Sequence, residues 1–317
     1  MEVLLADILA ARRRIAPHIV RTPLIHSPRL SDVLEADVWL KPEQWQLTGS
    51  FKIRGALNKM MQLADDERRR GVITASAGNH AQGVALAARL LGLSALLVTP
   101  ESTPQTKLDG IRQYGATVVQ HGVNYDEAEV YAEHLAQESG RVFIHAFEDP
   151  AIVAGQGTVG LEMFEDVPRL DAVLVPAGGG GLITGIGVAA RAVCPTTAVV
   201  GVQSEASPAW HAAFEANEVV DVEYGETWAE GLLGAIGRTN FTLARKVVDR
   251  IELVTESELK VAMRWALERH HWVLEGSGAV GLASALRGGR EVWQGQRLAI
   301  VLTGGNLDTA RLKSLLE

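Results

Sequence analysis

The sequence is poor in several features that mark other classes of protein. It has a single cysteine, Cys194, so no disulfide can form within the chain, and we expect a reducing compartment such as the cytoplasm. Its formal net charge is −8, which argues against nucleic acid as a partner, because binding to phosphates needs clustered Lys and Arg. It lacks an apolar run of about 18 residues, so we expect no membrane span, and its first residues do not follow the pattern of a signal peptide. We therefore predict a soluble cytoplasmic protein.

Several catalytic motifs are also missing. The nine histidines include no His-Glu-x-x-His pair, which disfavours a zinc hydrolase. No Gly-x-Ser-x-Gly turn occurs, which disfavours a serine hydrolase with a nucleophile elbow. No Gly-Lys-Ser/Thr follows the glycine-rich stretch, so a P-loop nucleotide hydrolase would lack its central lysine.

The chain does contain a regular alternation of apolar strand-like runs and amphipathic helix-like runs, which is typical of parallel sheets covered by helices. One series extends from 71 to 145, and a second begins at 171 and ends with RLAIVLTGGN at 297–306. We expect the N-terminal segment to pack with the second series. The fold class is therefore α/β, with two parallel-sheet domains and the active site in the cleft between them. We predict that the smaller domain, 66–147, is inserted into the larger domain, 1–65 and 148–317.

A run of four glycines, Gly178 to Gly181, lies between a predicted strand and a predicted helix. Glycines allow several backbone N–H groups to converge on an anion, and the helix adds its positive N-terminal end. Four glycines are costly to order unless they serve a purpose, so we predict a phosphate site. The later glycines Gly185 and Gly187 lie inside the helix, where we expect them to allow close helix packing.

Three further stretches combine a turn with reactive side chains at strand or helix ends. Lys52 follows a Thr-Gly-Ser turn and the apolar Phe51, surroundings that lower a lysine pKa and make the amine a usable nucleophile. The second stretch, Ser76 to His80, offers N–H groups and an amide to a carboxylate at a helix start, although Asn79 could equally cap the helix. In the third, Thr303 presents a hydroxyl at the end of a buried strand.

The order of five motifs along the chain, TGSFKIRGA, SAGNHAQG, GQGT, GGGGL and TGGN, resembles the fold type II pyridoxal-phosphate enzymes. Within them, the sequence is similar to the threonine/serine dehydratase (ammonia-lyase) and serine racemase family. The resemblance extends from Arg21 to Asn306 and implies pyridoxal 5'-phosphate as the cofactor. It also implies a homodimer or homotetramer. The GQGT motif, 155–158, is expected to line the cleft with its backbone.

The resemblance implies a role for each matching residue. Lys52 corresponds to the catalytic lysine that is bonded to the cofactor, and Thr303 to the hydroxyl at the pyridine nitrogen. The implied cofactor-binding residues are Phe51, Lys52, Asn79, Gly178, Gly179, Gly180, Gly181, Leu182, Glu275 and Thr303. The implied substrate-binding residues are Ser76, Ala77, Gly78, Asn79 and His80. The implied reaction converts L-threonine or L-serine to 2-oxobutanoate or pyruvate plus ammonia, by β-elimination of the hydroxyl.

Three departures from the family pattern affect these expectations. Racemases of the family carry a serine at the position of Ala77, so we expect weak racemisation here. Glu205 matches the first ligand of a divalent-cation site found in some relatives, but Trp210 replaces the second, which leaves metal binding open. Ala229-Glu230-Gly231 replaces the common Ala-Asp-Gly turn. Because of this last change, an alternative function remains: a dehydratase for another β-hydroxy amino acid, such as hydroxyaspartate, phenylserine or a hydroxyectoine-derived substrate.

Overall fold

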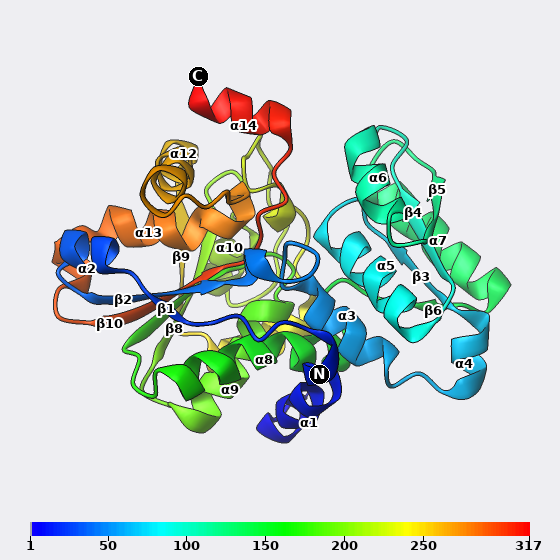
Figure 1. Ribbon diagram of the computed structural model, residues 1–317, viewed down its shortest axis with the longest axis horizontal. Helices are drawn as coiled ribbons and strands as arrows, with labels where there is room; N and C mark the ends of the chain where they lie inside the picture. The colour runs from blue at the N-terminus through cyan, green and yellow to red at the C-terminus, as the bar shows by residue number, and fades with distance from the viewer. Residues whose placement is uncertain (1) are drawn as a thin grey trace.

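The computed structural model describes residues 2–317, which form two lobes with a parallel sheet in each (Figure 1). The large sheet has the strand order β1-β2-β10-β7-β8-β9. Its strands are β1 (Ile25–His26), β2 (Asp37–Pro42), β7 (Ala172–Pro176), β8 (Ala198–Ser204), β9 (Arg250–Val254) and β10 (Arg297–Leu302). All neighbours pair in parallel except β1, which pairs antiparallel with β2 at the edge. The N-terminal segment thus joins the second series, as predicted.

The small sheet has the order β5-β4-β3-β6, and all its strands are parallel. They are β3 (Val72–Ala75), β4 (Ala95–Thr99), β5 (Thr117–Gln120) and β6 (Val142–Phe143). The two predicted β-α series therefore form two separate sheets, and the α/β fold class is confirmed. The four strands fall within 66–147, while the domain boundaries themselves stay a prediction.

Helices cover both sheets. In the small lobe they are α4 (Asp65–Arg70), α5 (Asn79–Leu91), α6 (Gln105–Arg112) and α7 (Tyr125–Ser139). Around the large sheet lie α1 (Leu5–Ile15), α2 (Pro28–Leu34), α8 (Pro150–Asp166), α9 (Gly181–Val193), α10 (Ala209–Ala216), α11 (Arg238–Val247), α12 (Glu256–Trp265), α13 (Gly276–Trp293) and α14 (Thr309–Leu316). Short turns of helix occur at η1 (Ala16–His18), η2 (Glu43–Trp45), η3 (Glu230–Leu232) and the π-helical η4 (Ala266–His270).

The large sheet is buried on both faces because its strands alternate their side chains between two cores. Val173 and Val175 of β7 pack with α8 and α9, whereas Leu174 packs with α12 and α13 on the opposite face. Figure 1 shows these two helical layers below and above the sheet. The carboxyl ends of the strands are thereby held in fixed positions, and in open α/β sheets ligands bind at that edge.

Helix α3 (Lys52–Met60) connects the two lobes. Its apolar side chains Ile53 and Leu57 share a core with Val72 and Val84 of the small lobe. Its Arg54 is fully buried and faces the large lobe, where the guanidinium binds Glu43 at 2.8 Å and Glu162 at 2.6 Å. The buried Lys41 also binds Glu162, at 2.6 Å. The two cations, Arg54 and Lys41, thus balance the charge of the two carboxylates. This charged cluster fixes the helix on which Lys52 lies.

The GQGT motif, 155–158, lies inside α8, and the expectation that its backbone lines the cleft is wrong. A Cβ on Gly155 would lie 2.7 Å from the carbonyl oxygen of Arg54, so this glycine allows α8 to pack directly against α3. Thr158 accepts a hydrogen bond from Arg54 at 3.1 Å. Gly185 of α9 has the packing role predicted for it, because a Cβ there would lie 2.5 Å from the carbonyl of Val153.

Candidate active site

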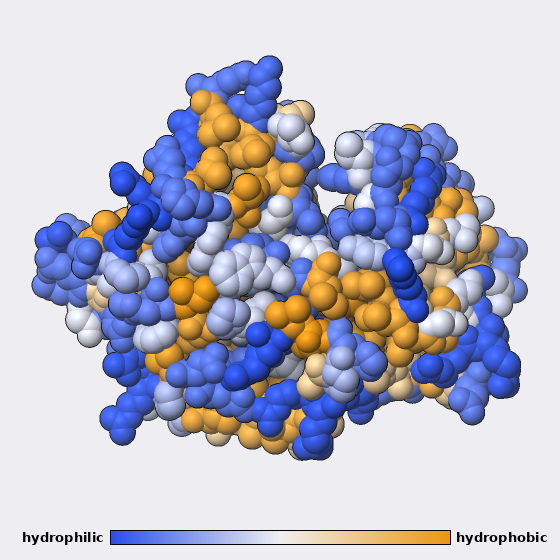
Figure 2. Space-filling model, viewed as in Figure 1, coloured by the Kyte–Doolittle hydropathy of each residue, from blue (hydrophilic) through white to orange (hydrophobic). Residues whose placement is uncertain are grey.

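The predicted cofactor-binding and substrate-binding residues lie where the two lobes face each other. They come from the start of α3, the β3–α5 turn, the β7–α9 turn, and the end of β10. Figure 2 shows the two lobes divided by a notch at the upper edge of the molecule, with hydrophilic residues along the outer rims. The site therefore lies in a cleft between parallel sheets.

Lys52 is positioned by a turn that is joined to the end of β10. Gly49 has a φ of +69°, a conformation that favours glycine, and its carbonyl accepts the N–H of Gly305 at 3.0 Å. The N–H of Phe51 donates to the carbonyl of Thr303 at 3.2 Å. These two bonds bring the predicted lysine and the predicted hydroxyl to the same place, although they are 251 residues apart in the chain.

The amine of Lys52 donates to the carbonyl of Ala146 at 3.1 Å and lies 5.4 Å from the centre of the Phe51 ring. Burial lowers the pKa of Lys52 to about 8, and the nearby carboxylate of Glu275 opposes this shift. A substantial fraction of the amine is therefore neutral near physiological pH, as a nucleophile or base requires.

Glu275 and Asn79 form a polar chain beside the lysine. The amide of Asn79 donates to Glu275 at 2.6 Å, and the amide of Asn306 donates to the side-chain oxygen of Asn79 at 2.7 Å. Burial raises the pKa of Glu275 to about 7, while the bond from Asn79 acts in the opposite direction. Asn79 is thus fixed by side chains from the opposite lobe.

The four glycines form a turn that leads from β7 directly into α9, as predicted. Gly180 has a φ of +100°, which an L side chain rarely adopts. A Cβ on Gly179 would overlap the ring of Phe147, and one on Gly180 would overlap the indole of Trp210. A side chain at either position would therefore force a packed aromatic ring to move. Leu182, in the first turn of α9, is buried in the core and anchors the helix start.

Thr303 is 3% exposed, and its hydroxyl donates weakly to the carbonyl of Ser277 at 3.3 Å. A hydroxyl rotates about its C–O bond, so Thr303 can instead donate its proton to an acceptor in the cleft. It offers this interaction without a charge, in contrast to a carboxylate at the same place.

The turn from Ser76 to His80 lies at the N-terminus of α5. The hydroxyl of Ser76 accepts the N–H of Gly78 at 3.2 Å, and Ala77 and Gly78 are partly exposed. His80 is buried and donates from Nε2 to the carbonyl of Ile144 at 3.0 Å. Burial and the neighbouring Lys52 lower the pKa of His80 to about 3, so the ring is neutral. Its predicted contact with substrate stays a prediction.

The predicted cation ligand Glu205 has an exposed side chain after β8. Within residues 2–317, no three His, Cys, Asp or Glu side chains lie close enough together to hold a metal ion. The indole of Trp210, five residues on, is fully buried and donates to the carbonyl of Gly178. Cation binding by Glu205 therefore stays a prediction.

The described chain, 2–317, also has no helix that is long and apolar enough to cross a membrane.

A family model described as pyridoxal-phosphate dependent enzyme matches residues 15–304. The chain belongs to this family. Its cofactor is pyridoxal 5'-phosphate, and the predicted family and fold type are confirmed.

Full-length relatives support the membership. The chain is 42% identical over 316 residues to the L-threonine ammonia-lyase of Thermotoga maritima, covering 99% of this chain and 78% of that protein. It is 39% identical over 317 residues to the catabolic L-threonine dehydratase of Escherichia coli, and the match covers 99% of this chain and 96% of that protein.

Solved structures show the same similarity. Maize serine racemase superposes with a TM-score of 0.95 at 32% identity, covering 100% of this chain and 97% of that one. The processed form of threonine deaminase isoform 2 from Solanum lycopersicum gives a TM-score of 0.94 at 34% identity, and the match covers 98% of this chain and 91% of that one.

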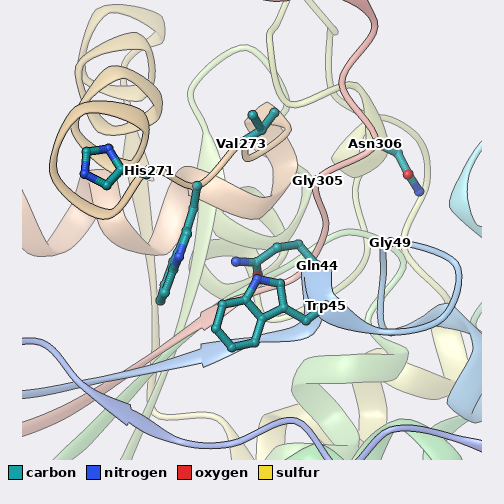
Figure 3. A pocket seen from close by; sticks show the side chains of 8 residues that line it. Gln44, Trp45, Gly49, His271, Val273, Gly305 and Asn306 are labelled. Atoms are coloured by element: carbon teal, nitrogen blue, oxygen red, sulfur yellow. The ribbon is translucent and has the colours of Figure 1, made fainter.

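Several contacts around the family site could not be predicted. Asn306 closes the TGGN turn and also borders a pocket of about 340 Å³, which Gln44, Trp45 and His271 help to line (Figure 3). Phe147 links the lysine side of the cleft to the glycines, because it follows Ala146 and packs on Gly179. Asn306 belongs to a recognisable motif, whereas no local sequence pattern marks Phe147.

Proposed function

We propose that this enzyme is an L-threonine ammonia-lyase that also accepts L-serine. It converts them to 2-oxobutanoate and pyruvate, with release of ammonia, by β-elimination of the hydroxyl. The observation that carries the proposal is Lys52, a lysine with a pKa of about 8 in a cleft that also holds a glycine turn at a helix start. The naming of relatives at 39% and 42% identity over almost the whole chain supports the choice of reaction.

The residues of the cleft fit pyridoxal 5'-phosphate at each of its functional groups. Lys52 supplies an amine for the aldehyde, and the glycine turn with the N-terminus of α9 supplies N–H groups for the phosphate. Asn79 supplies an amide for the ring hydroxyl, and Thr303 supplies an uncharged partner for the pyridine nitrogen. A Cβ at Gly179 or Gly180 would overlap a neighbouring ring. This supports a turn that carries no side chains and offers its backbone to the phosphate.

The protein residues then have distinct tasks. When bound, the cofactor supplies the electron sink that makes the Cα proton of an amino acid acidic. Lys52 takes that proton, because its depressed pKa leaves a neutral amine. The turn from Ser76 to His80 holds the substrate carboxylate at the N-terminus of α5. Thr303 would donate its hydroxyl proton to the pyridine nitrogen, an uncharged interaction that does not require this nitrogen to be protonated and so would favour prompt loss of the β-hydroxyl.

Substrate choice can be tested with purified enzyme by following 2-oxo acid release. We expect L-threonine and L-serine to be converted faster than hydroxyaspartate, phenylserine or hydroxyectoine-derived amino acids. A preference for one of the latter group would replace the proposed substrate but keep the reaction type. Amino acid consumption with no 2-oxo acid formed would contradict the reaction itself.

We further propose that the enzyme works in the cytoplasm as a homodimer or homotetramer. The single cysteine and the family resemblance support this. Light scattering after size-exclusion chromatography measures the assembly, and a monomer of 34.1 kDa would contradict it.

A further inference from the structure

Something must hold the glycine turn in one conformation, because glycine loses more backbone entropy on ordering than any other residue. An anion site also requires that their N–H groups point to the same side. The turn has no side chains of its own to enforce either condition. The residues that pack behind it must do so.

Trp210 of α10 lies directly behind the turn. Its side chain is fully buried, and its indole N–H donates to the carbonyl of Gly178. The ring packs so closely on Gly180 that any Cβ there would overlap it. Phe214 and Phe241 hold the indole in place at centroid distances of 6.1 Å and 6.2 Å. The carbonyl of Gly178 is therefore drawn away from the cleft.

Asn240 of α11 acts on the next peptide. Its side-chain amide is fully buried and donates to the carbonyls of Gly179 at 2.9 Å and Phe147 at 3.0 Å. Both neighbours are acceptors, so the NH₂ group of the amide must face them. The carbonyl of Gly179 is thus also held from behind, by an independent side chain.

In a trans peptide, the C=O of one residue and the N–H of the next point in opposite directions. Holding the carbonyls of Gly178 and Gly179 therefore turns the N–H groups of Gly179 and Gly180 toward the cleft. Within residues 2–317, neither N–H donates to a backbone carbonyl. We infer that Trp210 and Asn240 are positioning residues that aim these two N–H groups at the cofactor phosphate. The inference rests on the phosphate position in the proposed function.

The test compares pyridoxal 5'-phosphate with pyridoxal, which lacks the phosphate. Each is titrated into enzyme stripped of its cofactor, and the dissociation constant is measured from the cofactor absorbance. Trp210→Phe keeps an aromatic ring and removes the N–H. We expect it to weaken binding of pyridoxal phosphate about 5- to 10-fold, since a buried carbonyl loses its donor. Binding of pyridoxal should change less than about two-fold. The ³¹P resonance of the bound phosphate should also shift.

The matched control is Trp293→Phe. Trp293 is also buried, but its indole N–H has no hydrogen-bond partner among residues 2–317, so its removal should leave both dissociation constants unchanged. Asn240→Ser provides a second, independent variant and should show the same phosphate-specific loss. If both site variants bind pyridoxal phosphate like the wild type, or weaken both ligands equally, the inference is wrong. The wild-type ratio of the two constants tests the phosphate position itself, because equal affinity would contradict that part of the proposed function.

Discussion

Two strand-to-helix turns, one from each sheet, are built in opposite ways. The β7–α9 turn is packed from behind, so that a Cβ at Gly179 would overlap the Phe147 ring. The β3–α5 turn is open, and a Cβ at Gly78 would have no atom of the described residues, 2–317, within 4 Å. We call Lys52, Gly178–Gly181 and Thr303 the cofactor wall, and Ser76–His80 the substrate wall. Packing therefore fixes the cofactor wall before any ligand binds, whereas the substrate wall has space for a larger side chain.

Replacing the lysine of the cofactor wall should have the largest effect. Lys52→Ala removes the amine that both binds the cofactor and takes the Cα proton, so we expect turnover to fall by at least about 10³-fold. The steady-state rate of 2-oxo acid formation measures this. Lys59→Ala, in the same helix, is the control, because Lys59 only pairs with Asp149 at the partly exposed surface. Near-normal turnover of Lys52→Ala would show that Lys52 is not the catalytic residue.

The buried charges behind α3 should dominate stability. Arg54→Met leaves Glu43 and Glu162 without their shared cation, and we expect a loss of about 3–5 kcal/mol in the free energy of unfolding. Urea denaturation measures it. Arg12→Met breaks a surface pair with Glu165 and should cost at most about 1 kcal/mol. Equal losses in the two variants would show that the cluster does not anchor the helix.

Adding one methyl group to each turn compares the two walls directly. Gly179→Ala forces the Phe147 ring to move, and overpacking of this kind costs about 1–3 kcal/mol. We therefore expect the dissociation constant of pyridoxal phosphate to rise about 5- to 150-fold. Gly78→Ala should leave that constant unchanged, because its Cβ has free space. Similar losses in both variants would contradict the contrast between the walls.

The pKa of Lys52 should be visible in cofactor reconstitution. Only the neutral amine reacts with the aldehyde, so the rate should rise about tenfold per pH unit below 8 and level off above it. An ordinary lysine would continue to rise to about pH 10.4. Glu275 raises the lysine pKa, so Glu275→Gln should move the break to lower pH. A break that stays in place in this variant would show that the two charges do not interact.

The substrate wall should tolerate a new side chain and gain a new activity. Racemisation needs acid/base groups on both faces of Cα, and Ala77 offers only a methyl group. A missing general acid/base typically costs about 10²–10⁴-fold in rate. Ala77→Ser should therefore increase conversion of L- to D-serine, while L-threonine turnover falls only modestly. Chiral chromatography decides this, and the prediction fails if the variant forms no more D-serine than the wild type.

The motifs can be located from sequence because each lies at the end of a buried strand or the start of a helix, where glycine and polar residues interrupt an apolar run. Strands β2 and β9 do not stand out in this way. Strand β9 lies at the sheet edge and carries charged residues such as Arg250 and Glu252, so it lacks the apolar run of a central strand. The glycines of the GQGT motif resemble a turn at the cleft, but they serve helix packing.

The support behind the glycine turn has no signal in the sequence at all. Trp210 and Asn240 lie 30 and 60 residues beyond Gly180, on two different helices, and only the folded chain brings them to the carbonyls of the turn. A side chain that donates a hydrogen bond to a backbone carbonyl needs no fixed distance along the sequence and no particular neighbouring residues. Local patterns thus predict which groups react, whereas the groups that hold them depend on tertiary structure.

The position of α3 has a consequence for dissecting and recombining this enzyme. Ile53 and Leu57 belong to the apolar core of the small lobe, whereas Arg54 belongs to the charged cluster of the large one. A fragment cut at residue 66 would expose the apolar surface that α3 covers, and the remaining chain would carry a helix whose apolar face has lost its partners from the small lobe. A chimera that exchanges the small lobe with a relative should therefore carry the helix along, from Lys52 onward, and match Glu43 and Glu162 in the recipient.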